Sequence, residues 1–343
     1  TAGVISTAST TTTSATIDAT NAVITFGAVT LAGTTELDTN AAANSADLTL
    51  GAVTSGGNNL TLDTSAVAGA AISVASFAGG GVLTIRDSGG TTFAGTVAAA
   101  TVALTDTTGT IQFSDNLTVT TALTTASEAY LVSILGSANV IAGTTTFLNT
   151  GTVTLGDAAG DSTTFTAGLV ATAPGALNIA GTVAATTGST TITLGDSNTN
   201  VAVTASTLVG GAATGLIDIG DATLVDGATL TVGTGIANAI NLDKVTGTAS
   251  GAVSSLTINT SGLVNVAEAV GTDIGVVTLT QSGGTTFADT VAAVTVALTD
   301  TSGTIQFSGN LTATTALTTA SEDYAVSILG SANVIAGTTT FLN

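Results

Sequence analysis

One long stretch of this chain occurs twice with few changes. Residues 88–149 return as residues 282–343, which is an offset of 194 residues from position 88 to position 282. Near-identity at a fixed long period is typical of repeat architectures, in which each unit buries its apolar face against the next. The sequence therefore predicts an array of similar units. The substitutions between the copies are Gly95 to Asp289, Ala100 to Val294, Thr108 to Ser302, Asp115 to Gly309, Val119 to Ala313, Ala129 to Asp323 and Leu131 to Ala325.

A shorter motif, in which a threonine between two apolar residues is followed by a turn, recurs along the chain. Alternation of apolar and polar residues with many β-branched side chains predicts half-buried strands, and the Gly, Asp, Asn and Ser that follow favour turns. The motif spacing from Val153 onward is 39, 38, 26 and 21 residues. This spacing suits coils of roughly twenty residues with some motifs degenerate. The motif occurs as LTLGA at Leu48, LTLDT at Leu60, LTIRD at Leu83, VTLGD at Val153, ITLGD at Ile192, LTVGT at Leu230, LTINT at Leu256 and VTLTQ at Val277.

Helix competes poorly with strand in this sequence. Thr, Val and Gly are abundant, and each lowers helical preference. The best helical candidate, Ala122–Leu135, ends in YLVSIL, which suits a strand equally well. We therefore predict an all-β fold, a parallel β-helix (β-solenoid) that runs as one continuous body through residues 1–343. Short excursions from the coil are expected around residues 122–143 and 205–250.

The side chains that most enzymes use for catalysis are missing. The chain has no Cys, His, Met or Trp, and its only cations are Arg86 and Lys244, against 22 carboxylates. Acid–base catalysis near neutral pH usually recruits His, and anionic substrates need Arg or Lys. Carboxylate pairs of the glycosidase type stay open as an alternative. We expect a protein that is not an enzyme, with no catalytic or cofactor-binding residues.

Charge and hydropathy exclude two further classes of partner. A formal charge of −20 opposes binding to nucleic acid, which needs a cationic footprint. The apolar fraction is 44% and the mean hydropathy +0.61, but the apolar residues are scattered among Thr, Gly, Ser and Asn. The run Val97–Leu104 is too short to span a bilayer. We expect neither nucleic-acid binding nor membrane insertion.

The ends of the sequence and its lack of cysteine favour export. The chain begins TAGVIS without Met, which we interpret as removal of a secretion signal or as a segment of a longer chain. The second copy stops at Asn343, the counterpart of Asn149, after which the first copy continues TGTVTLGD. The 194-residue period is therefore expected to continue in a longer repetitive chain, the alternative being a protein that happens to end at this point. A long solenoid does not need disulfides, so the absence of Cys fits an extracellular location.

Strings such as TTTFLNTGTVTLGD, DSTTFTAGL and APGALNIAGTVAATTGSTTITLGD resemble the β-strand-repeat regions of large bacterial surface proteins. Filamentous-haemagglutinin-like exoproteins, autotransporter passengers and surface-layer or filament proteins are such proteins. The resemblance lies in composition and rhythm and covers nearly the whole chain. It implies a right-handed parallel β-helix on the cell surface, and it carries over no functional residue.

Aspartates gather where coils are expected to turn, in GDAAGD, GDSNTN and DIGDATLVDG. Calcium favours several oxygen ligands from carboxylates and backbone carbonyls, with Gly permitting a sharp turn. The alternative is that Asp caps these turns and keeps an apolar surface soluble. Calcium is thus a hypothesis, beside the alternative of no cofactor. The candidate ligands are Asp157, Asp161, Asp196, Asp218, Asp221 and Asp226.

Two functions follow from these features. The first is a structural protein that forms an extracellular filament, sheath or surface layer by stacking on further copies of itself, head to tail or side by side. The second is an adhesin stalk or binding region that contacts a cell-surface glycan or a host protein, with Thr121–Gly143 as its contact surface. Arg86 and Lys244 are expected to pair with their chain neighbours Asp87 and Asp243, without a function.

Overall fold

The computed structural model describes residues 4–6, 11–19, 21–40, 46–65 and 70–343, which form two compact units. Unit 1 holds the described residues up to Gly156 together with Asp161–Thr166 and Ala173–Gly175. Unit 2 holds Asp157–Gly160, Ala167–Thr172 and Ala176–Asn343. Regular structure in the described ranges is β-strand throughout, and none of it is a helix that is long and apolar enough to cross a membrane. The all-β prediction is confirmed, whereas one continuous solenoid over residues 1–343 stays a prediction.

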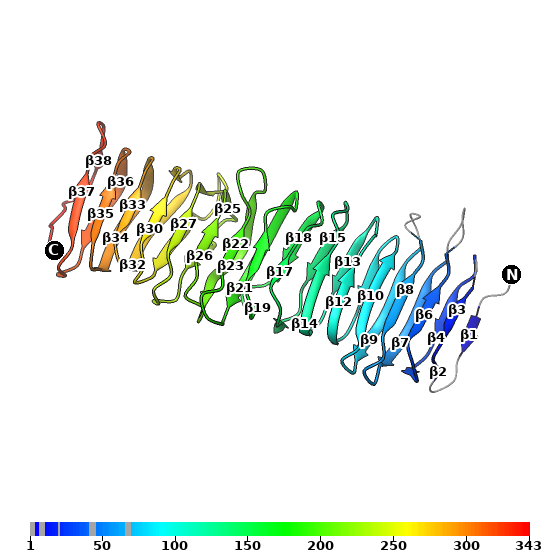
Figure 1. The fold of residues 1–343 in the computed structure, drawn as a ribbon. Helices are drawn as coiled ribbons and strands as arrows, with labels where there is room; N and C mark the ends of the chain where they lie inside the picture. Colours follow the sequence, from blue (N-terminus) through cyan, green and yellow to red (C-terminus); the bar gives the residue numbers. More distant parts are fainter. Residues whose placement is uncertain (1–3, 7–10, 20, 41–45, 66–69) are drawn as a thin grey trace. The chain divides into compact units, whose positions relative to one another are not determined.

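The strands are short and follow one another closely in both units (Figure 1). Unit 1 contains β1 (Val4–Ser6), β2 (Thr11–Thr13), β3 (Thr16–Asp18), β4 (Ile24–Phe26), β5 (Val29–Leu31), β6 (Thr35–Asp38), β7 (Leu48–Thr54), β8 (Leu60–Asp63), β9 (Ile72–Ala78), β10 (Val82–Asp87), β11 (Thr91–Phe93), β12 (Val97–Leu104), β13 (Thr110–Phe113), β14 (Leu117–Thr125), β15 (Leu131–Ile134), β16 (Asn139–Ile141), β17 (Thr145–Thr146), β18 (Thr152–Leu155) and β19 (Ser162–Phe165). Unit 2 contains β20 (Leu169–Ala171), β21 (Ala176–Ala185), β22 (Ile192–Leu194), β23 (Val201–Gly211), β24 (Ile217–Ile219), β25 (Ala222–Leu224), β26 (Thr229–Val232), β27 (Ile240–Leu242), β28 (Val245–Gly247), β29 (Ser254–Asn259), β30 (Val264–Val266), β31 (Val270–Gly271), β32 (Ile274–Ser282), β33 (Thr285–Phe287), β34 (Val291–Thr301), β35 (Thr304–Phe307), β36 (Leu311–Thr319), β37 (Ala325–Ile328) and β38 (Val334–Ile335).

The apolar–Thr–apolar motif forms strands because its period of two matches the pleat of a β-strand. In β18, Val153 and Leu155 are buried and Thr154 between them is half-buried. In β22, Ile192 and Leu194 take the inward positions in the same way. One short strand thus supplies two apolar side chains to the core and one hydroxyl to the outside.

Unit 1 is built from three parallel ladders of strands. The first ladder runs through β1, β4, β7, β9, β11, β13, β15 and β18. The second runs through β2, β5, β7, β9, β12, β14, β16 and β19. The third runs through β3, β6, β8, β10, β12 and β14. The longer strands turn a corner and enter two ladders, as the register shift between Ala99 and Thr101 in β12 shows.

Unit 2 repeats this plan within its own residues. Its first ladder runs through β20, β22, β24, β27, β30, β33, β35 and β37. Its second runs through β21, β23, β25, β28, β31, β34, β36 and β38. Its third runs through β21, β23, β26, β29, β32, β34 and β36. All these pairings are parallel, so each unit is a parallel β-solenoid.

The coil length follows from the contacts between successive coils. In unit 1, the hydroxyl of Thr107 donates to the carbonyl of Ser88 on the preceding coil, at a separation of 19 in the sequence. In unit 2, the side-chain amide of Asn238 donates to the carbonyl of Ala213 on the preceding coil, at a separation of 25. The prediction of coils of roughly twenty residues is confirmed, and the variable motif spacing reflects coils that differ by a few residues at their turns.

The segments expected to leave the coil are instead part of it. The helical candidate Ala122–Leu135 contains the end of β14, a turn and β15, and both strands are paired in register with their neighbours. In the second predicted excursion, residues 205–250, strands β23 to β28 also pair coil to coil. The β-branched residues in both segments favour strand, and the ladder of the preceding coil supplies the hydrogen-bonding partner.

The two near-identical sequence copies fold to the same local structure. Phe93 stacks on Phe113 in unit 1 with ring centroids 5.1 Å apart, and Phe287 stacks on Phe307 in unit 2 at 4.9 Å. The hydroxyl of Tyr130 donates to the carbonyl of Leu104 at 2.9 Å. The corresponding bond from Tyr324 to Leu298 measures 3.1 Å. The sequence repeat is therefore also a repeat of structure at these aromatic contacts.

Candidate functional site

A column of carboxylates runs along the third ladder of unit 1. The last residue of each of four successive strands, β3, β6, β8 and β10, is an aspartate, and neighbours in the ladder lie opposite one another. Because parallel coils stack equivalent positions at the spacing of adjacent strands, identical charges are brought close together. We call this column the aspartate ladder. Its members are Asp18, Asp38, Asp63 and Asp87.

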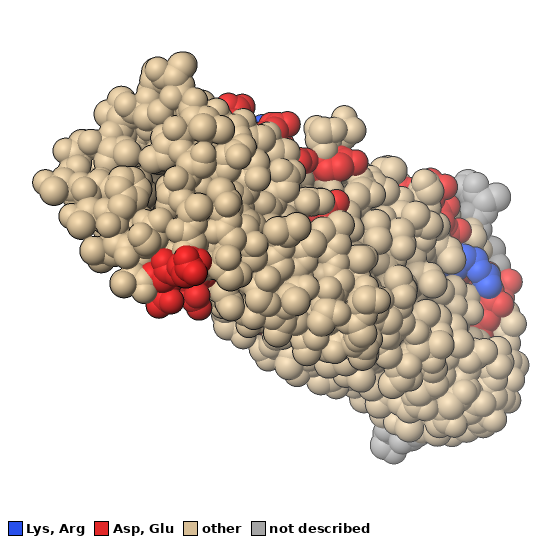
Figure 2. All heavy atoms as spheres, turned by 60° about the vertical axis from the view of Figure 1, so that its left-hand side comes forward, with Lys and Arg blue, Asp and Glu red and all other residues tan. Residues whose placement is uncertain are grey.

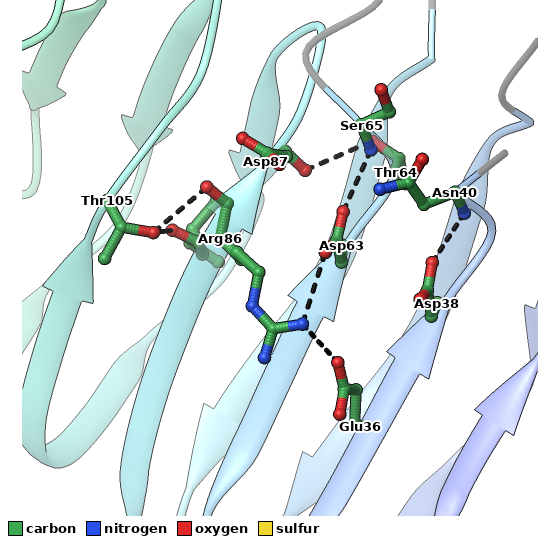
Figure 3. A network of polar contacts seen from close by, with 10 residues as sticks. Glu36, Asp38, Asn40, Asp63, Thr64, Ser65, Arg86, Asp87 and Thr105 are labelled. Carbon is green, nitrogen blue, oxygen red and sulfur yellow. Dashed lines mark hydrogen bonds and ion pairs between the residues drawn. The ribbon is translucent and has the colours of Figure 1, made fainter. Parts of the chain in front are cut away.

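One cation crosses the aspartate ladder. Arg86 is the extra residue of a β-bulge, since Ile85 pairs with Leu62 but the next paired residue is Asp87. The guanidinium of Arg86 reaches back to the carboxylate of Asp63, with Nη1 3.3 Å from Oδ2, and also bonds the carboxylate of Glu36 (Figure 3). A bulge re-aims a side chain that would otherwise follow the pleat. The insertion therefore places one positive charge among carboxylates of two earlier coils.

Burial raises the pKa of two members of this column, Asp38 and Asp87. Asp63 is the most enclosed member: its Oδ1 accepts the N–H of Ser65 at 3.0 Å and its Oδ2 faces Arg86. Burial raises the pKa of Asp38, and the carboxylates of Asp63, Asp18 and Glu36 add to that effect, against the N–H bond from Asn40. Burial also raises the pKa of Asp87 to about 6, with further contributions from Asp106 and Asp63. Neighbouring carboxylates of the aspartate ladder therefore repel one another where the coils stack.

Two members of the aspartate ladder and Glu36 form a tight group of acidic oxygens. Within the described ranges, Glu36, Asp38 and Asp63 form the one group of three or more potential ligand residues whose atoms all lie within 4.8 Å of one another. Arg86 already bonds two of the three carboxylates. Its guanidinium supplies the neutralising charge, and we assign no metal to this group.

Unit 2 carries a second charged column beside its first ladder. Asp196, Asp221 and Lys244 each stand two residues beyond the end of β22, β24 and β27, whose last residues are in register. The ammonium of Lys244 bonds the carboxylate of Asp221 on the preceding coil. The adjacent Asp243 has a pKa raised by burial first, and then by Asp218, Asp221 and Asp196.

The structure brings some of the predicted calcium ligands together and separates others. Three of the six, Asp196, Asp218 and Asp221, lie near Asp243, as their effect on its pKa shows. Asp196 caps its own turn, because its Oδ1 accepts the N–H groups of Asn198 and Thr199, both at 2.8 Å. None of the six belongs to the group of closely spaced oxygens described above, and calcium stays a prediction for them.

Of the other three predicted ligands, Asp157 and Asp161 lie in the connection between β18 and β19, and Asp226 lies in the connection between β25 and β26. Asp157 is exposed after β18, and Asp161 is buried immediately before β19. Asp226 is exposed, and its carboxylate accepts a hydrogen bond from the hydroxyl of Thr248 on the following coil. Calcium stays a prediction for these three residues as well.

Sequence reasoning missed the aspartate ladder and assigned the two cations wrongly. Arg86 pairs with Glu36 and Asp63, and Lys244 pairs with Asp221, whereas the expected partners were Asp87 and Asp243. In a parallel stack, residues one coil apart stand side by side, so each cation reaches a carboxylate of an earlier coil. The available signal was the Asp that closes TID, TELD, TLD and TIRD at Asp18, Asp38, Asp63 and Asp87.

The charged residues gather in clusters on the surface. Figure 2 shows the carboxylates in separate patches on a face that is otherwise uncharged, with the visible cations next to carboxylates. The surface between the clusters presents mainly Thr, Ser, Ala and Gly side chains, as the outward positions of the strands predict. The two charged columns are therefore the distinctive chemical features of the described surface.

The chain matches no protein-family model, no curated protein and no solved structure. The structural class of the chain is therefore assigned from its own architecture. In both units a short apolar–polar alternation gives the strands, and stacked coils of roughly twenty residues give the ladders. One sequence repeat gives one structural repeat. The chain is a β-strand-repeat protein of the parallel β-solenoid class.

Proposed function

We propose that this chain is an extracellular structural protein whose β-solenoid units stack into a surface filament, sheath or surface layer. The observation that carries the proposal is the structural equivalence of the two copies. The stacked pairs Phe93–Phe113 and Phe287–Phe307 have nearly the same geometry, with interplanar angles of 6° and 3°. An array in which every junction is alike extends without a limit on length.

The interior suits a load-bearing role. Inward Val, Ile, Leu and Phe side chains of successive coils are buried, and the backbone is paired along three parallel ladders in each unit. Each coil is thus fastened to the next by hydrogen bonds on three sides and by a shared apolar core. Such a stack is stiff, although each coil contains only roughly twenty residues.

The composition suits exposure outside a cell. Two cationic residues in the whole chain leave few cleavage positions for proteases that recognise Lys or Arg, and the absence of Cys and Met removes the side chains that oxidise most readily. The self-partner in this proposal is a further copy of the chain, because a parallel ladder pairs readily with a strand of the same register. A bacterial cell surface is the proposed location.

Electron microscopy of the purified chain and of native material, with and without a calcium chelator, tests this proposal. Uniform filaments or a lattice are expected. Isolated particles at every concentration would contradict the assembly, and loss of order on chelation would support calcium at the aspartate-rich turns. Isothermal titration with millimolar calcium checks that second point, where the absence of heat would count against calcium.

A second candidate is an adhesin stalk or binding region, and exposed apolar side chains favour it. Leu131, Val140 and Leu148 are 38%, 43% and 45% exposed, and they lie in or beside the segment Thr121–Gly143. Exposed apolar groups of this kind serve as contacts for a partner. Retention of monomers on a glycan array, reduced by Val140→Ser, would favour this function over assembly.

A further inference from the structure

Two aspartates, the half-buried Asp87 and the exposed Asp106, stand at neighbouring positions on adjacent coils of unit 1. Asp87 ends β10, and Asp106 follows β12, the next strand of the third ladder. The N–H of Asp106 donates to the carbonyl of Arg86 at 2.8 Å, which holds the two residues side by side. The Oδ1 atom of Asp87 is buried, and no N–H or hydroxyl of the described residues donates to it.

A buried carboxylate oxygen beside a second carboxylate is unfavourable when both groups are ionised, since like charges repel and neither offers a donor. A single proton between them removes the repulsion and supplies the missing donor. We propose that Asp87 and Asp106 share one proton and act as a pH-sensitive clasp between adjacent coils of unit 1. The clasp closes in mildly acidic solution and opens when the proton leaves.

The charges around Asp87 and Asp106 influence which of the two carboxyl groups binds the shared proton. The preceding coil presents Asp63 to Asp87, and the same strand carries Arg86. Arg86 bonds Asp63 and Glu36, so its positive charge lies on the side away from Asp106. Asp38 lies beyond Asp63 in the ladder and adds negative charge. The negative charges of Asp63 and Asp106 favour a proton on Asp87, and the positive charge of Arg86 opposes it.

The pKa of Asp87 agrees with this arrangement. It is raised from 3.8 to about 6, first by burial and then by Asp106 and Asp63, and a side-chain hydrogen bond with Asp106 contributes. Between these two pKa values the folded chain binds more protons than the unfolded chain, so stability falls as pH rises. The stabilisation is complete below about pH 4 and is lost as pH rises through about 6.

Unit 2 contains an internal reference for the clasp. There the ladder positions of Asp87 and Asp106 are taken by Gln281 and Asp300, which lie opposite each other in β32 and β34. A glutamine amide carries its N–H donors at every pH, whereas a carboxyl donates only when protonated. The position of Arg86 is taken by the neutral Thr280. The proposal thus predicts a pH response at one location and none at its counterpart.

Native-state hydrogen exchange of the full chain, read by mass spectrometry and corrected for intrinsic rates, tests the clasp. Amides of residues 82–106 are expected to lose protection by about three- to tenfold between pH 5 and pH 7.5, because one pKa unit corresponds to tenfold. Amides of residues 276–301 are expected to keep theirs. Equal responses in both units would overturn the proposal.

Reciprocal variants separate the clasp from general effects of charge. Asp87→Gln is expected to abolish the pH response of unit 1, and Gln281→Asp is expected to create one in unit 2. Asp115→Asn, which removes a carboxylate elsewhere in unit 1, is the matched control and should leave the response intact. A response that survives Asp87→Gln contradicts the proposal.

Carbon-13 NMR of aspartate carboxyl groups gives a readout that does not depend on stability. One carboxyl should titrate near pH 6 in the unmodified chain and disappear in Asp87→Gln. A further hydrogen-exchange measurement adds calcium at pH 7.5. If calcium protects the amides of residues 82–106 as fully as acid does, a metal cation and not a proton joins the two carboxylates, and the proposal is wrong.

Discussion

Arg86 forms an ion pair with Glu36, which stands 50 positions earlier in the chain and two coils away in the third ladder. On its way the guanidinium contacts Asp63 on the intervening coil. One cation therefore connects strands β6, β8 and β10. The single arginine of the chain therefore forms ion pairs that link three successive coils.

Replacement of Arg86 by Met is expected to destabilise unit 1 by about 1–3 kcal/mol, because Asp63 is left as a buried charge without its partner. The side chain of Asp63 is 3% exposed, so solvent screens it weakly. The free energy of unfolding in urea measures the loss. Lys244→Met is the control: its pair with Asp221 is 40% and 23% exposed, and the expected loss is below about 1 kcal/mol. Equal losses would contradict this account.

Tyr130 is expected to ionise late in the folded chain. Its hydroxyl donates to Leu104 at 2.9 Å and accepts the N–H of Ala126 at 3.0 Å. Burial raises its pKa to about 12 from the usual 10. The stabilisation is complete below pH 10 and is lost as pH rises through about 12, since the unfolded chain releases the proton first.

Ultraviolet absorbance titration of the phenol follows this ionisation. Tyr130→Phe should remove the late step and lower the free energy of unfolding by about 1–2 kcal/mol through the lost hydrogen bonds. An unchanged titration curve in that variant would assign the step to another group.

Gly81→Ala is expected to destabilise unit 1 by about 2–3 kcal/mol or more, because the new Cβ atom collides with the backbone of the preceding coil. A Cβ atom at Gly81 would lie 1.8 Å from the carbonyl oxygen of Asn58. Thermal unfolding measures the effect. Gly160→Ala is the matched control, because a Cβ there meets nothing within 4 Å, and a comparable loss in the control would refute the steric explanation.

Phe113→Ala and Phe307→Ala are expected to cost the same amount, about 3–5 kcal/mol each, because both rings are fully buried. Each stacks on the phenylalanine of the preceding coil, Phe93 or Phe287. Hydrogen exchange in each unit reports the two losses separately. A difference greater than about 1 kcal/mol would show that the copies are not energetically equivalent.

Much of the fold was predictable because its determinants are local. The alternation in Thr152–Leu155 and Ile192–Leu194 specifies strands without knowledge of the neighbours, and the spacing of such motifs gives the coil length. The pairing within Ala122–Leu135 was harder to predict, since helix and strand preferences balance there until a ladder is present on which β14 and β15 form.

The charged columns could not be predicted in full, because they depend on register between coils of unequal length. Asp63 lies opposite Asp87 only through the bulge that inserts Arg86. Lys244 meets Asp221 because β24 and β27 end in register, with Ile219 opposite Leu242, and each charged residue follows its strand by two positions. The sequence neighbours Asp87 and Asp243 were therefore the wrong partners to predict for Arg86 and Lys244.

The short distance along the chain between paired strands has a consequence for how the protein folds. Each new coil closes a loop of roughly twenty residues, such as the loop from Ile72 to Thr91 or the loop from Ile192 to Ile217. The entropic cost of adding a coil therefore does not grow with the length already folded. Folding can spread from one early pair of coils in equal steps, and its rate is insensitive to chain length. Pulled from its ends, each unit should yield one coil at a time and release about twenty residues per step, in a regular sawtooth of force.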